Sequence, residues 1–292
     1  MKEIIVLSGK GGTGKTTVTA ALAVLMANRV VADCDVDAAD LHLVLAPEDL
    51  EEHEFRSGVE PLIDRGKCSA CGTCVDLCHF HALALRETAE LLPFSCEGCG
   101  VCARFCPEGA ITLAEKVSGT WFVATTSSGP MIHARLGIGE ENSGKLVALV
   151  KRQAREAAER CNAAWLLVDG PPGIGCPVIA SLSGADFVLL VTEPTRSGLH
   201  DLARVADLAA HFRIRAGVCI NKWDLHPEQS REIEAFCQTR MMPLLGRIPF
   251  DRAVVESIVC GRTLPDYASD APANRAVEQI WQNLQEKVAS EG

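Results

Sequence analysis

The stretch Gly9-Lys10-Gly11-Gly12-Thr13-Gly14-Lys15-Thr16 decides the fold of this 292-residue chain. It fits the pattern G-x-x-x-x-G-K-[ST], follows an apolar run at residues 3–8 and opens a helical stretch of small residues. In that context the glycines let backbone N–H groups close around phosphate oxygens, and the helix N-terminus adds positive potential. The sequence therefore predicts a phosphate-binding loop in which Lys15 reaches the β- and γ-phosphates and the Thr16 hydroxyl ligates Mg²⁺.

Apolar runs alternate with helical periodicity along most of the remaining chain. Strands are expected at residues 30–33, 164–169, 186–191, 214–220 and 244–248, and helices near 15–28, 197–211, 227–239 and from 277 onward. This alternation predicts an α/β fold with a doubly wound, mostly parallel sheet. Ligands bind at the carboxyl ends of the strands in such sheets, where Asp33, Asp35, Asp169 and Asn221 occur.

The composition excludes several classes of function. Acidic residues outnumber basic residues by 38 to 28, which gives a formal net charge of −10 and argues against binding nucleic acid or an anionic membrane through a basic face. No run approaches the ~18 apolar residues of a membrane span, and the N-terminal apolar run is too short for a signal peptide. We therefore expect a cytoplasmic protein without nucleic-acid or membrane partners.

Eight of the fourteen cysteines fall in two runs, each with the pattern C-x2-C-x2-C-x3-C. The second run begins 28 residues after the first, as in duplicated bacterial two-cluster ferredoxins. In that arrangement the fourth cysteine of each run ligates the other cluster. We therefore assign one [4Fe–4S] cluster to Cys68, Cys71, Cys74 and Cys106, and the other to Cys96, Cys99, Cys102 and Cys78.

Zinc is the competing ligand, because Cys₄ zinc sites also use C-x2-C pairs, but the third cysteine at the next step favours the cubane. The first run has His79 where a proline is usual, and Cys78 is still expected to bind. We place a small α+β ferredoxin domain at residues 59–116, inserted into a discontinuous ATPase domain at 1–58 and 117–292. The acidic residues 48–54 are expected to form connecting surface.

Lys10 makes the loop K-G-G-x-G-K-T, which resembles the deviant Walker A ATPases of the MinD, ParA and Mrp families and the nitrogenase iron protein, P-loop NTPases of the SIMIBI type. The resemblance implies that Lys10 reaches the partner's nucleotide in a dimer, Asp35 orients the attacking water and Asp169 holds Mg²⁺ through water. With Lys15 these are the implied catalytic residues. The implied nucleotide-binding residues are Gly9, Lys10, Gly11, Gly12, Thr13, Gly14, Lys15, Thr16, Thr17, Asn221 and Pro249.

Together the motifs predict a Mg²⁺-dependent ATPase of low turnover that binds ATP and two [4Fe–4S] clusters. It would dimerise with itself or a related ATPase and couple ATP to electron transfer with a redox protein. One alternative is an iron–sulfur carrier of the Mrp kind, although the six other cysteines form no C-x-x-C pair. Another is a MinD/ParA-like positioning or scaffold ATPase. Cys176, seven residues after Asp169, is either an interface thiol or, as we favour, a packing residue.

Overall fold

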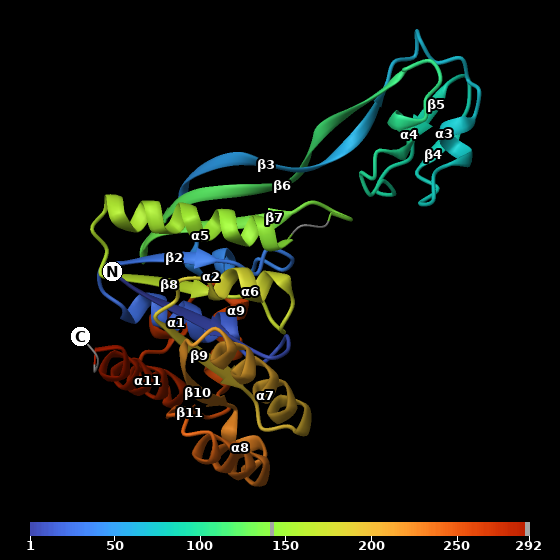
Figure 1. Cartoon of the computed structure of the whole chain (residues 1–292). Coiled ribbons are helices and arrows are strands. Elements are labelled where there is room, and N and C mark those ends of the chain that lie inside the picture. The colour runs from blue at the N-terminus through green and yellow to red at the C-terminus, as the bar shows by residue number, and fades with distance from the viewer. Residues whose placement is uncertain (141–142, 290–292) are drawn as a thin grey trace. The chain divides into compact units, whose positions relative to one another are not determined.

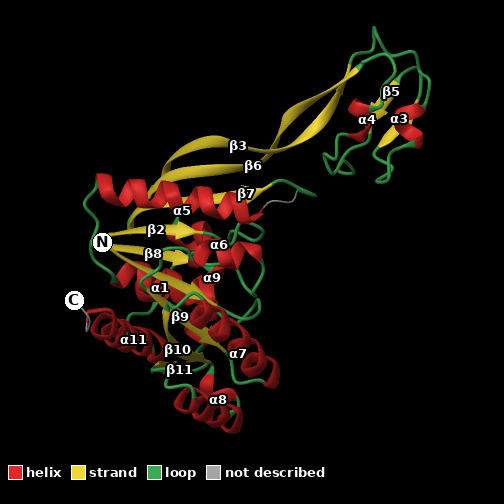
Figure 2. Ribbon diagram, in the orientation of Figure 1, coloured by secondary structure: helices red, strands yellow, loops and turns green. Residues whose placement is uncertain are grey.

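A single sheet organises the chain in the computed structural model, which describes residues 1–140 and 143–289 (Figures 1 and 2). In this part of the chain nine strands lie in the order β11-β10-β9-β1-β8-β2-β7-β6-β3. From β11 to β7 every neighbouring pair is parallel, which confirms the predicted α/β fold with a mostly parallel sheet. The strands are β1 (Lys2–Leu7), β2 (Arg29–Asp33), β3 (Glu48–Ile63), β6 (Ile111–Thr126), β7 (Gly129–Leu136), β8 (Trp165–Asp169), β9 (Phe187–Thr192), β10 (Arg215–Asn221) and β11 (Leu244–Ile248).

Helices cover both faces of this sheet. Ile4 and Val6 of β1 belong to a core shared with the first and last long helices, whereas Ile5 and Leu7 point to the opposite face and are equally buried. Contacts pair α1 with α11, and α5 with α6, β2 and β8. The helices are α1 (Lys15–Leu25), α2 (Leu41–Leu45), α5 (Ser143–Arg160), α6 (Cys176–Leu182), α7 (Arg196–His211), α8 (Pro227–Thr239), α9 (Arg252–Val259), α10 (Leu264–Tyr267) and α11 (Pro272–Ala289). A short 3₁₀ helix, η1 (Trp223–Leu225), follows β10.

The chain divides into two compact units, with borders several residues outside the predicted 59–116. One unit comprises Met1–Glu52, Trp121–Arg135 and Ser143–Gly292, and the other His53–Thr120 and Leu136–Asn142. The divisions fall inside β3 and β6, which continue through both units. Residues 48–54 are therefore not connecting surface as we expected, because they begin β3.

The second unit combines the ends of β3 and β6 with two similar halves. The Asp64 N–H donates to the Ala110 carbonyl at 2.8 Å. Gly72 and Gly100, 28 residues apart, both have φ in the left-handed region, at 80° and 74°, and each precedes a short helix. The shared geometry shows the duplication in three dimensions. The small elements are α3 (Thr73–Asp76), β4 (Leu83–Leu85), β5 (Ala89–Leu91) and α4 (Val101–Arg104), with β4 and β5 antiparallel.

Candidate functional site

The phosphate-loop sequence connects β1 to α1, where the predicted motif required it. Gly12 and Gly14 have φ of 81° and 89°, a region that favours glycine. Gly9 is required for a different reason: a Cβ there would lie 2.5 Å from the backbone carbonyl carbon of Asp201 in α7. The Asn221 side chain donates to the Thr13 carbonyl at 2.7 Å. The end of β10 therefore holds the loop beside α1.

Lys15 lies against carboxylates at the ends of two strands. Its Nζ is 3.0 Å from Asp169 Oδ2 and 3.6 Å from Asp35 Oδ2. Burial disfavours the charged lysine, but the nearby Asp169 and Asp35 outweigh it and raise the pKa of Lys15. Asp169 also accepts hydrogen bonds of 2.8 Å from the hydroxyls of Thr16 and Thr19. The lysine therefore stays charged, and the Thr16 hydroxyl is already oriented toward an acidic oxygen.

Asp33 and Asp35 flank the start of the loop at residues 34–40. Asp33 is fully buried and accepts hydrogen bonds from the N–H groups of Asp35 and Leu41, at 3.1 and 3.2 Å. Burial first, and the charge of Asp169 second, raise the pKa of Asp33 well above its usual range. The same two causes raise the pKa of Asp35 to about 6, against the opposing effect of Lys15. The sequence predicted Asp33 at the ligand-binding end of its strand but gave it no catalytic or binding role.

Lys10 is held within its own chain. Its Nζ is 2.7 Å from Glu193 Oε1 and 3.0 Å from Ser197 Oγ. Glu193 also lies 3.7 Å from the Nζ of Lys222 and thus pairs with two lysines of the site. Glu193 could not be predicted as a site residue, because only the fold brings the end of β9 beside the loop.

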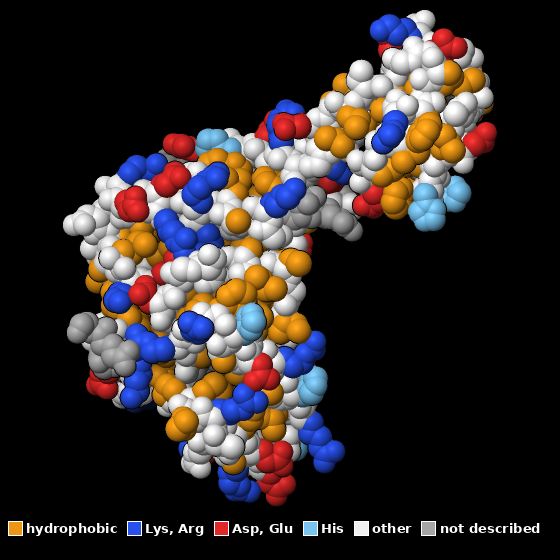
Figure 3. Space-filling view, in the orientation of Figure 1, with side chains coloured by type: hydrophobic (Ala, Val, Ile, Leu, Met, Phe, Trp, Pro, Cys, Tyr) orange, Lys and Arg blue, Asp and Glu red, His pale blue; other side chains and the backbone are white. Residues whose placement is uncertain are grey.

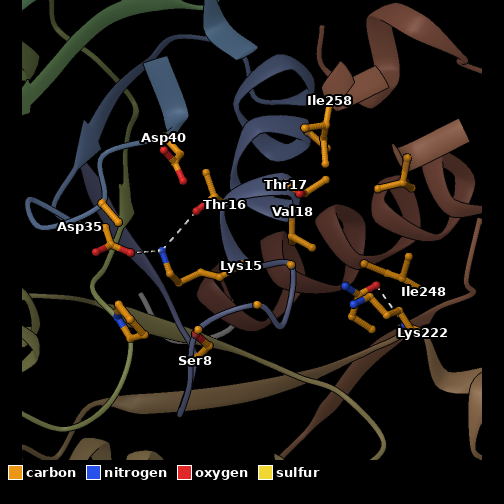
Figure 4. A pocket seen from close by; sticks show the side chains of 18 of the residues that line it. Ser8, Lys15, Thr16, Thr17, Val18, Asp35, Asp40, Lys222, Ile248 and Ile258 are labelled. Carbon is orange, nitrogen blue, oxygen red and sulfur yellow. Dashed lines mark hydrogen bonds and ion pairs between the residues drawn. The ribbon is translucent and has the colours of Figure 1, made fainter. Parts of the chain in front are cut away.

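A cavity of about 620 Å³ opens beside the loop (Figure 4). Lys15, Thr16 and Asp35 lie at one end of it, and Ile248 and Ile258 at the other. Most of the predicted nucleotide-binding residues line it, namely Gly11, Gly12, Gly14, Lys15, Thr16, Thr17 and Asn221. Lys10, Thr13, Gly9 and Pro249 do not line it.

The apolar end of the cavity contains residues of three helices that were not predicted to lie there. It is formed by Val254 and Val255 of α9, Leu264 of α10 and Val277 of α11. Asp224 fixes the loop beside it, because its Oδ1 accepts the N–H of Phe250 at 2.7 Å. One side of this cavity can thus hold phosphates and the other a flat apolar group. The predicted residue nearest to this end was Pro249, which does not line the cavity, whereas the adjacent Ile248 does.

Two small cavities in the second unit are each lined by four cysteines. One is lined by Cys68, Cys71, Cys74 and Cys106, and the other by Cys78, Cys96, Cys99 and Cys102. The fourth cysteine of each run thus lines the cavity of the other run. The N–H groups of Ala82 and Ala110 donate to Cys78 Sγ and Cys106 Sγ, each at 3.3 Å.

The cysteines are not arranged for a single metal ion. All fourteen are free thiols, and nowhere in residues 1–140 and 143–289 do three His, Cys, Asp or Glu side chains converge as one ion requires. Burial raises the pKa of Cys74, and the charges of Cys68, Cys71 and Cys106 raise it further. The four thiols of this cavity are thus close enough to interact electrostatically.

Cys176 is the first residue of α6, with Pro177 next to it in the first turn. It is exposed, so our preferred interpretation of Cys176 as a buried packing residue was wrong. It lies near Gly144, where an added Cβ would be 3.6 Å from the Cys176 Cβ. Across the described residues, no helix is both long and apolar enough to cross a membrane.

The site and sheet define a nucleotide-binding protein of the P-loop class. Residues 4–264 match the family model described as "CobQ/CobB/MinD/ParA nucleotide binding domain", and the chain belongs to this family. It is 31% identical over 289 residues to the uncharacterized protein MJ0578 of Methanocaldococcus jannaschii, covering 97% of this chain and 96% of the relative.

Solved structures of the same fold include cell-division proteins. The septum site-determining protein MinD of Pyrococcus horikoshii, complexed with Mg-ADP, superposes with a TM-score of 0.61 at 18% identity, over 100% of this chain and 98% of that one. The MinC:MinD complex of Aquifex aeolicus gives a TM-score of 0.58 at 19% identity, over 98% and 96%. At these identities the likeness establishes the fold.

Proposed function

We propose that this chain is a Mg²⁺-dependent ATPase that changes state with its bound nucleotide. The observation that carries the proposal is Lys15, buried between Asp35 and Asp169 at the end of a phosphate loop. Phosphoryl transfer requires charge neutralisation and a positioned water molecule more than covalent chemistry. The cavity beside the loop has a charged end for phosphates and an apolar end for a base.

Each polar group at the charged end has a role in this proposal. Lys15 neutralises charge on the transferred phosphate, and the pKa of about 6 suits Asp35 for accepting a proton from water near neutral pH. The oxygens of Thr16 and Asp169 are ligands that Mg²⁺ accepts, and they already lie 2.8 Å apart. A bound Mg²⁺ would supply charge neutralisation at the phosphates.

Lys10 has a second role in a dimer. Its ion pair with Glu193 holds it away from the cavity of its own chain. We infer that Lys10 leaves Glu193 to contact the nucleotide of a second ATPase subunit, either an identical chain or a related one. The Lys10 and Glu193 side chains are 30% and 19% exposed, so solvent screens the ion pair and the exchange costs on the order of 1 kcal/mol.

The second unit fits two [4Fe–4S] clusters. Each small cavity has four free cysteines, and backbone N–H groups already donate to Cys78 and Cys106, as is usual for cluster ligands. Cys68, Cys71, Cys74 and Cys106 would hold one cluster, and Cys78, Cys96, Cys99 and Cys102 the other. When bound, such clusters supply one-electron redox chemistry. Zinc is disfavoured by the sequence pattern, because a third cysteine follows each C-x2-C pair at the next step.

Electron transfer to a protein partner is the function we propose for this unit. Its surface exposes large apolar side chains, including Phe94 at 74% and Phe105 at 56%, and hydrophobic side chains are visible on the face shown in Figure 3. Exposed apolar surface of this kind is typical of sites that contact other proteins. ATP would control this electron transfer.

A MinD/ParA-like positioning ATPase is the second candidate, and the comparisons favour it. The family match and the cell-division structures concern nucleotide binding, and none of their descriptions mentions a cluster. In this case the ATPase unit would recruit a protein partner, and the cysteine-rich unit would be structural. The iron–sulfur carrier is a weaker candidate, because Cys176, Cys161 and Cys260 are exposed but separate in sequence.

Anaerobic purification distinguishes these candidates. The proposal predicts about eight iron and eight sulfide per chain, ATP hydrolysis abolished in Lys15→Ala, and EPR spectra of the reduced protein that change when ATP is added. The control variant Cys161→Ser should keep all the iron, since this exposed cysteine lies outside both cavities. Hydrolysis by a protein free of iron would support the positioning ATPase, and iron without any response to ATP would refute the coupling.

A further inference from the structure

Three aromatic rings stack in the first unit between the 34–40 loop and the long strands. His42 of α2 and His133 of β7 are parallel, with ring centroids 5.1 Å apart and an interplanar angle of 4°. Phe122 of β6 also stacks on His133, with ring centroids 4.7 Å apart. The stack therefore joins α2 to two strands of the sheet.

Two nitrogens in this stack are buried without a hydrogen-bond partner. His42 Nδ1 and His133 Nε2 are both inaccessible to solvent, and neither has a partner among the residues that the structure describes. Burial, and then the charges of His42 and Arg135, lower the pKa of His133 to about 4, so its ring is neutral near pH 7. Buried polar atoms without partners are unfavourable. An arrangement of the loop that supplied a partner to either nitrogen would thus be favoured.

The same stack is connected to the carboxylates of the nucleotide site. Asp33 pairs with His133 in the register of β2 and β7, and its carboxylate accepts the N–H of Leu41, the residue before His42. Asp33 also accepts the N–H of Asp35, which lines the cavity. The buried Asp33 carboxylate therefore links Asp35 to Leu41. If Asp35 shifts toward bound nucleotide, this link transmits the shift to Leu41 and to the adjacent His42.

Strands β6 and β7, which carry Phe122 and His133, continue toward the cysteine-rich unit. β6 begins at Ile111, five residues after Cys106, and β7 ends where the second unit's segment 136–142 begins. The link is covalent, so it does not depend on how the two units are placed. A change in the pairing or packing of β6 and β7 would therefore be transmitted along the backbone to Cys106, a proposed cluster ligand.

We propose that His42 and His133 are positioning residues that couple the nucleotide site to strands β6 and β7. Nucleotide binding moves the 34–40 loop, the rings re-pair through their free nitrogens, and the packing of the two strands changes. The inference rests on the proposed nucleotide-dependent switch, but it does not require that the clusters be redox-active. Coupling of this kind needs an element with two arrangements, and the stack with its unpaired nitrogens is that element.

The test measures amide hydrogen exchange in residues 121–136 of the full-length protein, with and without Mg-ATP, in the wild type and in His133→Phe. Phenylalanine keeps the stacked ring and removes the nitrogens. We expect nucleotide to change exchange in β6 and β7 of the wild type, and this change to be lost in His133→Phe while protection of the phosphate loop remains. Because coupling is reciprocal, the variant should also bind ATP about five-fold less tightly or weaker still.

The matched control is Trp281→Phe, which alters another buried ring pair, that of Trp165 and Trp281 with centroids 5.2 Å apart. This variant should respond to nucleotide as the wild type does. His42→Phe provides a second test if His133→Phe does not fold. Nucleotide protection of the loop without any change in β6 and β7 of the wild type, or an unchanged response in both histidine variants, would overturn the inference. Absence of any nucleotide binding would instead refute the proposed function, and the inference with it.

Discussion

Replacing Asp35 by asparagine should stabilise the nucleotide-free protein while it removes hydrolysis. Asp35 is 14% exposed, and burial together with the charge of Asp169 raises its pKa from 3.8 to about 6. A carboxyl whose pKa is raised by folding favours the folded state at low pH, and this contribution is lost as the pH rises from 3.8 through 6. A shift of about two units corresponds to about 3 kcal/mol that the ionised carboxylate costs the folded protein above pH 7.

Asparagine has nearly the same shape, carries no charge and can still accept a hydrogen bond from Lys15. We therefore expect Asp35→Asn to raise the free energy of unfolding by about 1–3 kcal/mol at pH 8, and by less than about 1 kcal/mol at pH 4. Urea unfolding at the two pH values, without nucleotide, measures both. Steady-state phosphate release measures the loss of hydrolysis in the same variant.

The control is Asp37→Asn, which removes an exposed carboxylate from the same loop. It should change stability by no more than about 0.5 kcal/mol at either pH. A less stable Asp35→Asn protein at pH 8, or a gain of equal size at both pH values, would refute the electrostatic reasoning. Normal hydrolysis by Asp35→Asn would remove this residue from the proposed mechanism.

Three further predictions concern the loops and the cysteines. Lys15→Ala should abolish tight ATP binding in equilibrium titrations, whereas Lys10→Ala should bind ATP and hydrolyse it slowly; equal loss of binding would contradict a role across the dimer. Gly9→Ala should lower stability by about 1–3 kcal/mol in urea unfolding, because its Cβ would overlap the backbone of α7; unchanged stability would mean that α7 moves freely. Cys106→Ser should damage the cluster of the first run and Cys78→Ser that of the second, as read by iron content and EPR; loss at the nearer run in each case would contradict the crossed pattern.

Six of the seven parallel strands could be predicted from the sequence because they are largely buried, whereas β7 was not predicted. β1, β8 and β9 are continuous apolar runs, and each ends in or next to a polar residue of the site. The phosphate loop was equally clear, because a fixed pattern of glycines and one lysine has few other uses. These signals are local, so one chain is enough to recognise them.

The long strands β3 and β6 could not be predicted for a physical reason. β3 is rich in charged residues, and of its side chains Phe55 and Ser57 are buried while their neighbours are more exposed. Such a strand buries little apolar surface and is stabilised by pairing with a partner distant in sequence. The acidic run at 48–54 therefore looked like a surface connection, and the borders of the inserted unit were placed several residues inside β3 and β6.

The contacts of the charged site residues could not be predicted from local sequence patterns either. Glu193 reaches Lys10 only because β9 lies next to β1 in the sheet, and Asp33 meets Asp169 only because β2 pairs with β8. The crossed cysteine cavities are the opposite case. The duplicated spacing already predicted that each fourth cysteine belongs to the other run, because that rule rests on a known geometry rather than on contacts special to this chain.

The carboxylates of the site destabilise the folded protein, and this is the best physical sign that the site is functional. Lys15 pairs with both Asp35 and Asp169, and Asp33 lies beside them, so one positive charge faces three carboxyl groups and burial raises the pKa of Asp33 and Asp35. A chain selected for stability alone would replace at least one of them by an amide or an apolar residue. A cation bound by Thr16 and Asp169 would offset the repulsion, and so would asparagine at position 35. Only the cation would leave the Asp35 carboxylate in place to act on water, which is why Asp35→Asn separates stability from turnover.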